Sequence, residues 1–360
     1  MLRNKRTRVL FIRAFSITVI SLFVIAGGTF LGWRSLVRPP IVPTMGQNVH
    51  GSSPTSGSNS GIDNPAFDAV EPHPDDAGIN RDAPFAFTDE DRRPDFYTFL
   101  IFGYDSGLNT DTIMVAAYDA AAQRAYIISI PRDTQVDVQR NVRRINSAYP
   151  AGRARGGGHA GGVDQLKREV QTIIGFRPDF YVSIEEDAFV TIVDAVGGVY
   201  IDVPFRMHYS DIYQDLYINI PAGRQRLDGE NALHFVRFRY HYGQTSAIST
   251  HQRQEHQHQF VNAMMQELLT PRIITTIPQL IRTYLDHVNT DLALRNLLWF
   301  GEQFVLGDIT LITYNYPVTS IRTTRWYDVP VADEALELIN RTINPFTRDI
   351  TVDMLQLVPR

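Results

Sequence analysis

The sequence predicts an α/β domain built around a mixed β-sheet. Short apolar runs rich in β-branched and aromatic residues are bounded by turn residues, as buried strands are. Segments with apolar residues three or four positions apart alternate with these runs, which is the spacing of amphipathic helices. One connection between two strand candidates, DAAAQ, is short enough for a hairpin, so at least one strand pair is antiparallel. Alternation of strands and helices with some antiparallel pairing predicts a layered α/β fold.

The strand candidates share high β-propensity and flanking turn residues. DAAAQ joins the second candidate to the third, which predicts that these two pair antiparallel. The candidates are residues 96–103, 111–118, 124–130, 180–184, 199–204 and 234–242.

Three helices are expected, at residues 163–174, 188–196 and 250–269. In the first, Val163, Leu166 and Val170 fall near one face, and Gly175 follows as a C-cap. A pair of glycines closes the second helix before the next strand. Tail elements at 309–316 and 331–343 complete the domain.

Composition limits the function classes. The chain has 360 residues, of which 44% are hydrophobic and 20% charged, enough for one large domain with an anchor and a linker. The formal net charge of -5 offers no broad cationic field, so we expect no nucleic-acid partner and a local arginine cluster at any phosphate site. The chain has no cysteine, which excludes disulfides, thiolate zinc sites and cysteine nucleophiles.

The N-terminal region predicts a membrane anchor. Residues 14–33 carry no charge, and twenty helical residues span a hydrocarbon core of about 30 Å. Basic residues are more numerous before this run than after it, which places the N-terminus in the cytoplasm. The alternative, a cleaved signal peptide, fits less well because the run is long and no small-residue cleavage site follows. The basic residues are Arg3, Lys5, Arg6, Arg8 and Arg13 before the run, and Arg34 and Arg38 after it.

These features divide the chain into three predicted parts. Residues 1–38 are a basic cytoplasmic tail and a single transmembrane helix. Residues 39–94, rich in Pro, Gly, Ser and Asp, form a flexible stalk. Residues 95–360 form the folded, extracytoplasmic domain, so the protein is expected at the cell membrane with its C-terminal domain outside.

Two aspartates stand at adjacent strand ends. Asp105 follows the first strand candidate and Asp111 opens the second. Two carboxylates at one rim suit Mg²⁺ shared with a phosphate. The alternative is that aspartates in a turn bond backbone amides.

Arginines recur near other predicted strands. Arg132 and Asp133 lie just beyond the third candidate, where a surface ion pair is the alternative to a functional role. In a strand at 234–242, Arg237 and Arg239 would project to one face and present two guanidinium forks to anionic oxygens. The alternative there is an exposed strand face with solvated arginines.

Two further motifs carry weaker signals. If helical, His251, Glu255 and His258 share a face, but no His-Glu-x-x-His zinc motif is present, and a solvated helix face is the favoured interpretation. The glycine run at 156–162 lacks the Lys-Ser/Thr ending of a phosphate loop and is expected to be a flexible loop.

Taken in order, seven segments resemble the motifs of the LytR-CpsA-Psr family. The resemblance covers residues 96–269, and the SIPRD and LDG-x-x-AL-x-x-VR-x-R blocks make it specific. The segments are FLIFGYDS, TDTIMVAAYD, IISIPRDTQV, RINSAY, VDAVGGVYIDVP, RLDGENALHFVRFR and RQ.

The resemblance implies a three-layer α-β-α domain that transfers a glycopolymer from a polyprenyl-pyrophosphate carrier to a cell-wall acceptor glycan at the membrane, with pyrophosphatase as a side activity. Asp105 and Asp111 would hold Mg²⁺ or Mn²⁺, and Asp133 would join them in the reaction. The pyrophosphate would be met by Arg132, Arg237, Arg239, Arg253 and Gln254.

This sequence departs from the family pattern at three positions. Asn109 and Thr250 replace arginines that similar members have, and Ala247 replaces an aspartate. His251, Asp211 or Asp133 are candidates to compensate for the missing groups. Two alternatives to an active transferase therefore stay open. One is a polyprenyl-phosphate-binding regulator with impaired catalysis, and the other is a structural envelope protein.

Overall fold

The computed structural model describes residues 37–43, 87–105, 108–211, 216–239, 248–270, 276, 279–283, 286 and 288–358. The predicted anchor at 14–33 and most of the predicted stalk lie outside these residues. Within the described ranges, no helix has the length and hydropathy needed to cross a bilayer. The described residues group into two compact units, one of residues 37–41 with 292–307 and one of the remainder.

The smaller unit contains helix α8 (Leu294–Leu306). Asn296 stabilises the start of this helix, because its side-chain oxygen accepts a hydrogen bond from the Ala293 amide at 3.2 Å. The amide nitrogen of Asn296 also donates to the Arg38 carbonyl at 3.2 Å. The segment near Arg38 is thereby attached to the helix.

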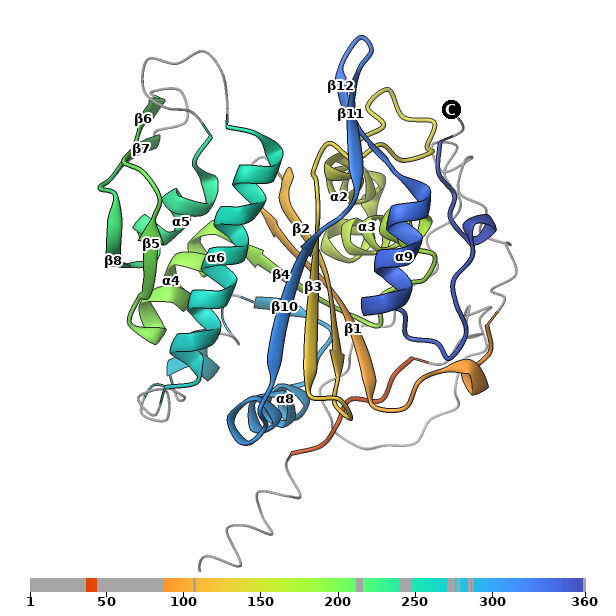
Figure 1. The fold of residues 1–360 in the computed structure, drawn as a ribbon, viewed down its shortest axis with the longest axis horizontal. Helices are drawn as coiled ribbons and strands as arrows, with labels where there is room; N and C mark the ends of the chain where they lie inside the picture. Colours follow the sequence, from red (N-terminus) through yellow and green to blue (C-terminus); the bar gives the residue numbers. More distant parts are fainter. Residues whose placement is uncertain are drawn as a thin grey trace, which may run out of the picture. The chain divides into compact units, whose positions relative to one another are not determined.

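The larger unit is built on a six-stranded mixed sheet with the order β10-β3-β2-β1-β4-β9 (Figure 1). The β3–β2 and β2–β1 pairs are antiparallel, β1–β4 and β10–β3 are parallel, and β9 pairs antiparallel with β4. The predicted hairpin and the mixed sheet are both confirmed. The strands are β1 (Phe96–Tyr104), β2 (Thr110–Asp119), β3 (Arg124–Ile130), β4 (Phe180–Glu185), β9 (Val288–Thr290) and β10 (Thr310–Asn315).

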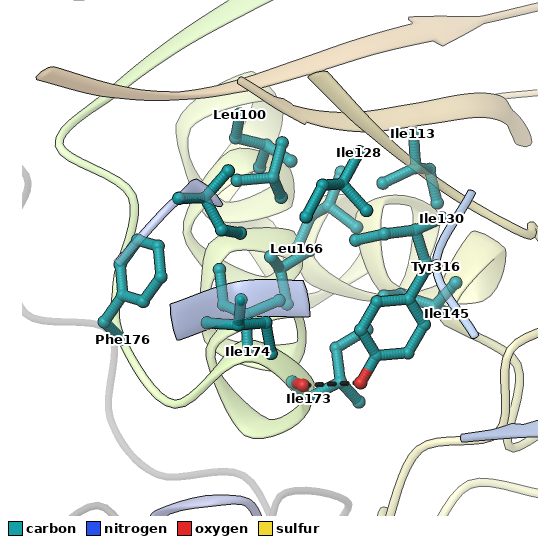
Figure 2. Close-up of a cluster of buried hydrophobic side chains, with 14 of the residues drawn as sticks. Leu100, Ile113, Ile128, Ile130, Ile145, Leu166, Ile173, Ile174, Phe176 and Tyr316 are labelled. Atoms are coloured by element: carbon teal, nitrogen blue, oxygen red, sulfur yellow. Dashed lines mark hydrogen bonds between the residues drawn. The ribbon is translucent and has the colours of Figure 1, made fainter. Parts of the chain in front are cut away.

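One face of the sheet packs against α3 (Gly158–Ile174) and α9 (Ala332–Thr342). Leu166 and Ile173 of α3 are fully buried there with Ile128 of β3 (Figure 2). Complete burial of such a side chain contributes about 1.5 to 3 kcal/mol. The Tyr316 hydroxyl donates to the Ile173 carbonyl at 2.6 Å, so the polar atom in this core is paired (Figure 2).

The opposite face carries α6 (Thr250–Leu268), whose Val261 packs against Met114, Ala116 and Ile127 of the sheet. Helices therefore cover both faces (Figure 1). A second apolar core joins α6 to two short helices and two two-stranded sheets. These elements are α4 (Glu186–Val196), α5 (Gly229–Arg237), β5 (Val199–Val203), β6 (Met207–Asp211), β7 (Leu216–Ile220) and β8 (Gly223–Leu227).

The prediction of a strand at 234–242 is wrong for the residues that the structure describes there, because 234–237 are the end of helix α5. Asp228 is the N-cap of this helix, and its carboxylate accepts a hydrogen bond from the backbone amide of Asn231 at 2.9 Å. Ala232 and Phe235, three positions apart, are both fully buried, which is helical rather than strand spacing. Arg237 is consequently the last residue of a helix, and it does not share a strand face with Arg239.

The glycine run at 156–162 is only in part the loop that was expected. Residues 158–162 begin α3 (Gly158–Ile174), which therefore starts before residue 163, and a kink at Gly156, where φ is 91°, separates α3 from α2 (Ala148–Gly152). A Cβ on Gly152 would lie 2.2 Å from the Gly161 carbonyl oxygen, and one on Gly162 would lie 2.5 Å from the Tyr149 ring. The glycines permit close packing of two helices.

The segment directly before β1 meets the segment that follows α9. Arg92 forms an antiparallel bridge with Phe346, and the Thr347 amide donates to the Asp91 carbonyl at 2.8 Å. Arg348 pairs with the Asp91 carboxylate at 2.8 Å, and Phe87 stacks on Phe346 with ring centroids 4.0 Å apart. Phe96, Ile339 and Phe346 belong to the same buried cluster, so the C-terminal segment completes the main core.

Candidate active site

The candidate site lies at one edge of the central sheet. β1, β3 and β4 end at this edge and β2 begins there, since β2 is antiparallel to both of its neighbours and β1 is parallel to β4. Asp105, Asp111, Arg132 and Glu186 follow or open these strand ends. Ligands of open α/β sheets bind outside the carboxyl ends of strands, so the edge is the expected place for a site.

Asp111 connects two arginines from distant parts of the chain. Its Oδ1 accepts a hydrogen bond from Arg132 at 2.7 Å, and its Oδ2 accepts one from Arg239 at 2.5 Å. Burial favours the neutral carboxyl, but the Arg239 and Arg132 charges outweigh it and lower the pKa of Asp111. Asp111 is therefore a charged carboxylate that neutralises part of an arginine cluster.

Arg253, on α6, is the third guanidinium of this cluster. Burial, and then repulsion by Arg239 and Arg132, lowers its pKa to about 10. Within the part of the chain that the structure describes, its buried Nε has no hydrogen-bond partner. Three cations around one carboxylate leave an excess of positive charge, which suits an incoming anion.

Arg237 reaches the same edge but bonds a different carboxylate. It donates to Glu186, the first residue of α4, at 2.6 Å. Burial is the largest influence on Glu186, and with the nearby charges of Asp105 and Asp111 it raises the pKa above its usual value despite Arg237. Glu186 was not among the predicted site residues, although two acidic residues, Glu185 and Glu186, follow the predicted strand at 180–184.

Asp133 lies between two arginines. Its carboxylate is 3.9 Å from Arg132 and 3.2 Å from Arg144, and both arginine side chains are mostly buried. Arg144 also donates twice, at 2.6 and 3.1 Å, to the carbonyl of Trp326. Asp133 is thus a carboxylate close to both arginines, and its nearer contact is with Arg144.

Asp105 occupies a tight turn. Its Oδ1 accepts a hydrogen bond from the backbone amide of Asn109 at 3.0 Å, and its carbonyl accepts one from the backbone amide of Leu108 at 2.9 Å. This contact matches the turn-capping alternative, while the influence of Asp105 on Glu186 places it at the same rim. Asn109 is exposed here.

The residues fit Mg²⁺ only in combination with a substrate. Mg²⁺ is usually bound by one or two carboxylates together with phosphate oxygens and waters. Asp105 and Asp111 can supply the carboxylates, and a substrate would supply the phosphate oxygens. Both oxygens of Asp111 accept arginine hydrogen bonds, so a cation there requires Arg132 or Arg239 to turn toward a phosphate. Among the described residues, no cluster of three or more potential metal-ligating side chains occurs.

Helix α6 buries polar residues against the sheet, which contradicts a fully solvated face. Gln254 donates to the Ser129 carbonyl at 3.0 Å, and His258 bonds the Ser129 hydroxyl at 2.8 Å. His251 and Glu255 are exposed, with 71% and 51% of their side-chain surfaces accessible, and lie 4.0 Å apart. The three zinc candidates therefore do not converge, and the Gln254 amide is used in docking the helix.

The compensating candidates fall in different places. Asp211 ends β6, where it accepts a hydrogen bond from Tyr209 at 3.2 Å, and His251 is on the exposed side of α6. Of the contacts described for these residues, those of Asp133 lead into the arginine cluster. Thr250 is the first residue of α6, and Ala247 lies outside the described residues.

An apolar sheet face adjoins the rim. Met114 and Ala116, in the strand that Asp111 opens, are buried on the side that faces α6. The partly buried side chains of Phe99, Ile101 and Leu311 extend the same surface. Val261 of α6 packs on this surface, so it belongs to the core between the sheet and α6.

The fold and the site define a mixed α/β protein with a cluster of arginines at one edge of its central sheet. A family model described as the LytR_cpsA_psr family matches residues 71–343. The chain belongs to this family.

Curated relatives include transferases and a regulator. The polyisoprenyl-teichoic acid–peptidoglycan teichoic acid transferase TagV of Bacillus subtilis (strain 168) is 27% identical over 190 residues, which cover 51% of this chain and 45% of TagV. TagU of Oceanobacillus iheyensis, with the same transferase description, is 26% identical over 240 residues, or 65% of this chain and 69% of TagU. The regulatory protein MsrR of Staphylococcus aureus (strain COL) is 24% identical over 229 residues, or 61% of this chain and 64% of MsrR.

Solved structures show the same fold. The crystal structure of Bacillus subtilis TagV has a TM-score of 0.55 at 21% identity and covers 74% of this chain and 100% of that chain. A structure of TagT bound to LI-WTA has a TM-score of 0.54 at 18% identity and covers 69% of this chain and 89% of that chain.

Proposed function

We propose that the protein is a phosphotransferase that moves a glycopolymer from a polyprenyl-pyrophosphate carrier to cell-wall peptidoglycan or a related wall acceptor. The observation that carries the proposal is the cluster of Arg132, Arg239 and Arg253 around Asp111 at the edge of the sheet. The relatives named as teichoic acid transferases support the same reaction class.

In the proposed reaction, a hydroxyl of the acceptor attacks the phosphorus that bears the glycopolymer. The bond from this phosphorus to the bridging oxygen breaks, and polyprenyl phosphate leaves. Arg132, Arg239 and Arg253 bind the pyrophosphate oxygens and stabilise the charge that moves to the leaving group. Asp133, 3.9 Å from Arg132, places a further negative charge beside this arginine.

The reaction also requires a group that accepts the proton of the attacking hydroxyl, and a carboxylate at the rim can do so. Both oxygens of Asp111 accept arginine hydrogen bonds, and Oδ1 of Asp105 accepts a turn amide. Glu186, held by Arg237 through Oε2, is the carboxylate that we assign to this step. When bound by Asp105 and Asp111, Mg²⁺ or Mn²⁺ would neutralise phosphate charge.

We also propose that residues 14–33 anchor the protein in the cell membrane, with the catalytic domain outside. The lipid carrier stays in the bilayer, so an anchored enzyme meets it at a high effective concentration. Protease treatment of intact protoplasts should remove the C-terminal domain. Protection of that domain would contradict the topology.

Release of polyprenyl phosphate from a synthetic polyprenyl-pyrophosphate glycan, measured with Mg²⁺ and a wall acceptor, tests the activity. Transfer should be abolished in Arg239→Ala and retained in Arg124→Ala, an exposed arginine at the start of β3. Lipid binding without turnover by the wild-type protein would instead support the regulator alternative.

A further inference from the structure

The hairpin of β11 (Val318–Arg322) and β12 (Trp326–Pro330) presents an exposed tryptophan. Trp326 is 54% exposed, although an indole ring is usually largely buried. Its cross-strand partner is Arg322, whose guanidinium lies 5.7 Å from the ring centroid. A tryptophan supplies a large, rigid surface at low entropic cost, which suits stacking against the apolar face of a sugar ring.

The hairpin is attached to the segment that carries the candidate site. The Asp328 amide donates to the Asp133 carbonyl at 3.0 Å, and the Gln135 amide donates to the Asp328 carbonyl at 2.9 Å. Arg144 connects the Trp326 carbonyl to the Asp133 carboxylate. Trp326 is therefore fixed relative to Arg132, the neighbour of Asp133 in the arginine cluster.

The tip of the hairpin is polar, although Ile321 beside Arg322 is an apolar side chain with 38% exposure. Thr323, Thr324 and Arg325 form the tip of the hairpin, so the tip offers hydroxyl and guanidinium groups rather than an apolar wedge. A membrane-inserting loop buries apolar side chains at its tip, and this composition argues against that role. Hydroxyl-rich sugars hydrogen-bond to such groups.

A recess in the same loop region adds further polar groups. It has a volume of about 400 Å³, within the range of pockets that hold small ligands. The recess is lined by residues before and after Arg144 in the sequence, namely Gln139, Arg140, Asn141, Val142, Ser147 and Ala151. Figure 1 shows the hairpin beside this loop, in agreement with the hydrogen bonds of Arg144.

We infer that the β11–β12 hairpin and the adjoining recess form a subsite for pyranose rings of the acceptor glycan, with Trp326 as the stacking platform. The assignment of this glycan as the acceptor rests on the proposed function. The subsite holds the acceptor beside Arg132, and its hydroxyl is thereby directed toward the pyrophosphate.

Binding of an uncharged tetrasaccharide of β-1,4-linked N-acetylglucosamine to the full-length protein in detergent tests the inference. By calorimetry, without lipid or metal, Trp326→Ala should weaken binding at least tenfold, while Trp326→Tyr should stay within about threefold of wild type because a ring remains. Tyr200→Ala is the matched control. Tyr200 is also an exposed aromatic residue paired across strands with an arginine, Arg226, whose guanidinium lies 5.7 Å from its ring.

Equal affinity of the wild-type and Trp326→Ala proteins, or no binding by the wild type, would overturn the inference. If the Ala variant does not fold, the Trp326→Tyr variant provides the test. The wild type should show a change in indole fluorescence when the saccharide is added, and the Trp326→Tyr variant should not show this change. Sedimentation with anionic phospholipid vesicles tests the membrane role. Loss of vesicle binding in Trp326→Ala with unchanged saccharide binding would reassign the hairpin to the bilayer.

The transfer assay separates this inference from the proposed function. With the lipid substrate, Trp326→Ala should raise the KM for the acceptor and leave lipid affinity unchanged. If transfer requires Arg239 but is unaffected by Trp326→Ala at any acceptor concentration, the subsite is refuted and the proposed function is supported. If the protein binds the saccharide through Trp326 but transfers nothing, the subsite is supported and the proposed function is refuted.

Discussion

Replacing Asp111 by Asn tests the electrostatics of the rim. The substitution preserves side-chain size but removes the charge to which Arg132 and Arg239 donate at 2.7 and 2.5 Å. Hydrogen bonds to charged groups contribute about 1.5 to 3 kcal/mol each, and the Asp111 side chain is 35% exposed, which reduces this. We expect the free energy of unfolding to fall by about 1 to 2 kcal/mol, or about 2 to 6 °C in thermal midpoint.

The same substitution should strengthen anion binding when no metal is present. Asp111 competes with a pyrophosphate for Arg132 and Arg239, and its negative charge repels the ligand. Removing that charge should increase the affinity for inorganic pyrophosphate in EDTA by on the order of tenfold, or about 1.4 kcal/mol. With Mg²⁺ the order should reverse, since the variant lacks a metal-binding carboxylate.

Thermal midpoints and calorimetric titrations of the wild type and Asp111→Asn, each with EDTA and with Mg²⁺, measure both effects. Asp202→Asn, at an exposed position on β5, is the control and should change neither quantity. An Asp111→Asn protein with a wild-type midpoint and wild-type pyrophosphate affinity would refute the assignment of Asp111 as the counter-charge of the cluster.

Three further predictions concern other parts of the domain. Arg239→Ala should weaken pyrophosphate binding by about 1 to 3 kcal/mol in calorimetry and Arg239→Lys by less, and equal affinities would exclude Arg239 from the site. Gly152→Ala should lower the thermal midpoint, because a Cβ would overlap the Gly161 carbonyl, whereas Gly301→Ala, with open space around it, should not; similar midpoints would contradict the close packing. Burial lowers the pKa of His256 to about 4, so the unfolded chain takes up a proton at a higher pH than the folded chain does. The free energy of unfolding should therefore fall as the pH is lowered from 6.5 toward 4, by at most about 3 kcal/mol. Chemical denaturation should show a smaller loss over this range for His256→Leu, and equal losses would exclude His256 as the cause.

The sheet and most helices were predictable because each had a local signal. The first strands are uninterrupted apolar runs with a short hairpin connection, and Gly175 ends α3 in the left-handed conformation with φ of 81°. Helix α5 was missed because its aromatic residues resemble a strand, although the Asp228 cap and the spacing of Ala232 and Phe235 favoured a helix. Local propensity was outweighed there by packing against the second core.

The site was predicted in its members but not in its connections. Arg239 was chosen for a strand that does not exist, yet it reaches Asp111 because its chain segment lies between α5 and α6. Neither the pairing of Arg237 with Glu186 nor the position of Asp133 between Arg132 and Arg144 has a signal in the sequence. These contacts depend on residues far apart in the chain that only the folded sheet brings together.

The contact between the segment before β1 and the segment after α9 has a consequence for how the chain folds during synthesis. The core around Phe96 requires Ile339 and Phe346, and Asp91 bonds residues near position 347. Because the chain is synthesised from its N-terminus, the first strands are made long before the C-terminal residues of their core. This core can therefore form only after nearly the whole chain has been synthesised. Folding is thus expected to be late and all-or-none, and chains that stop before α9 should be recovered as unfolded or degraded material rather than as shorter stable domains.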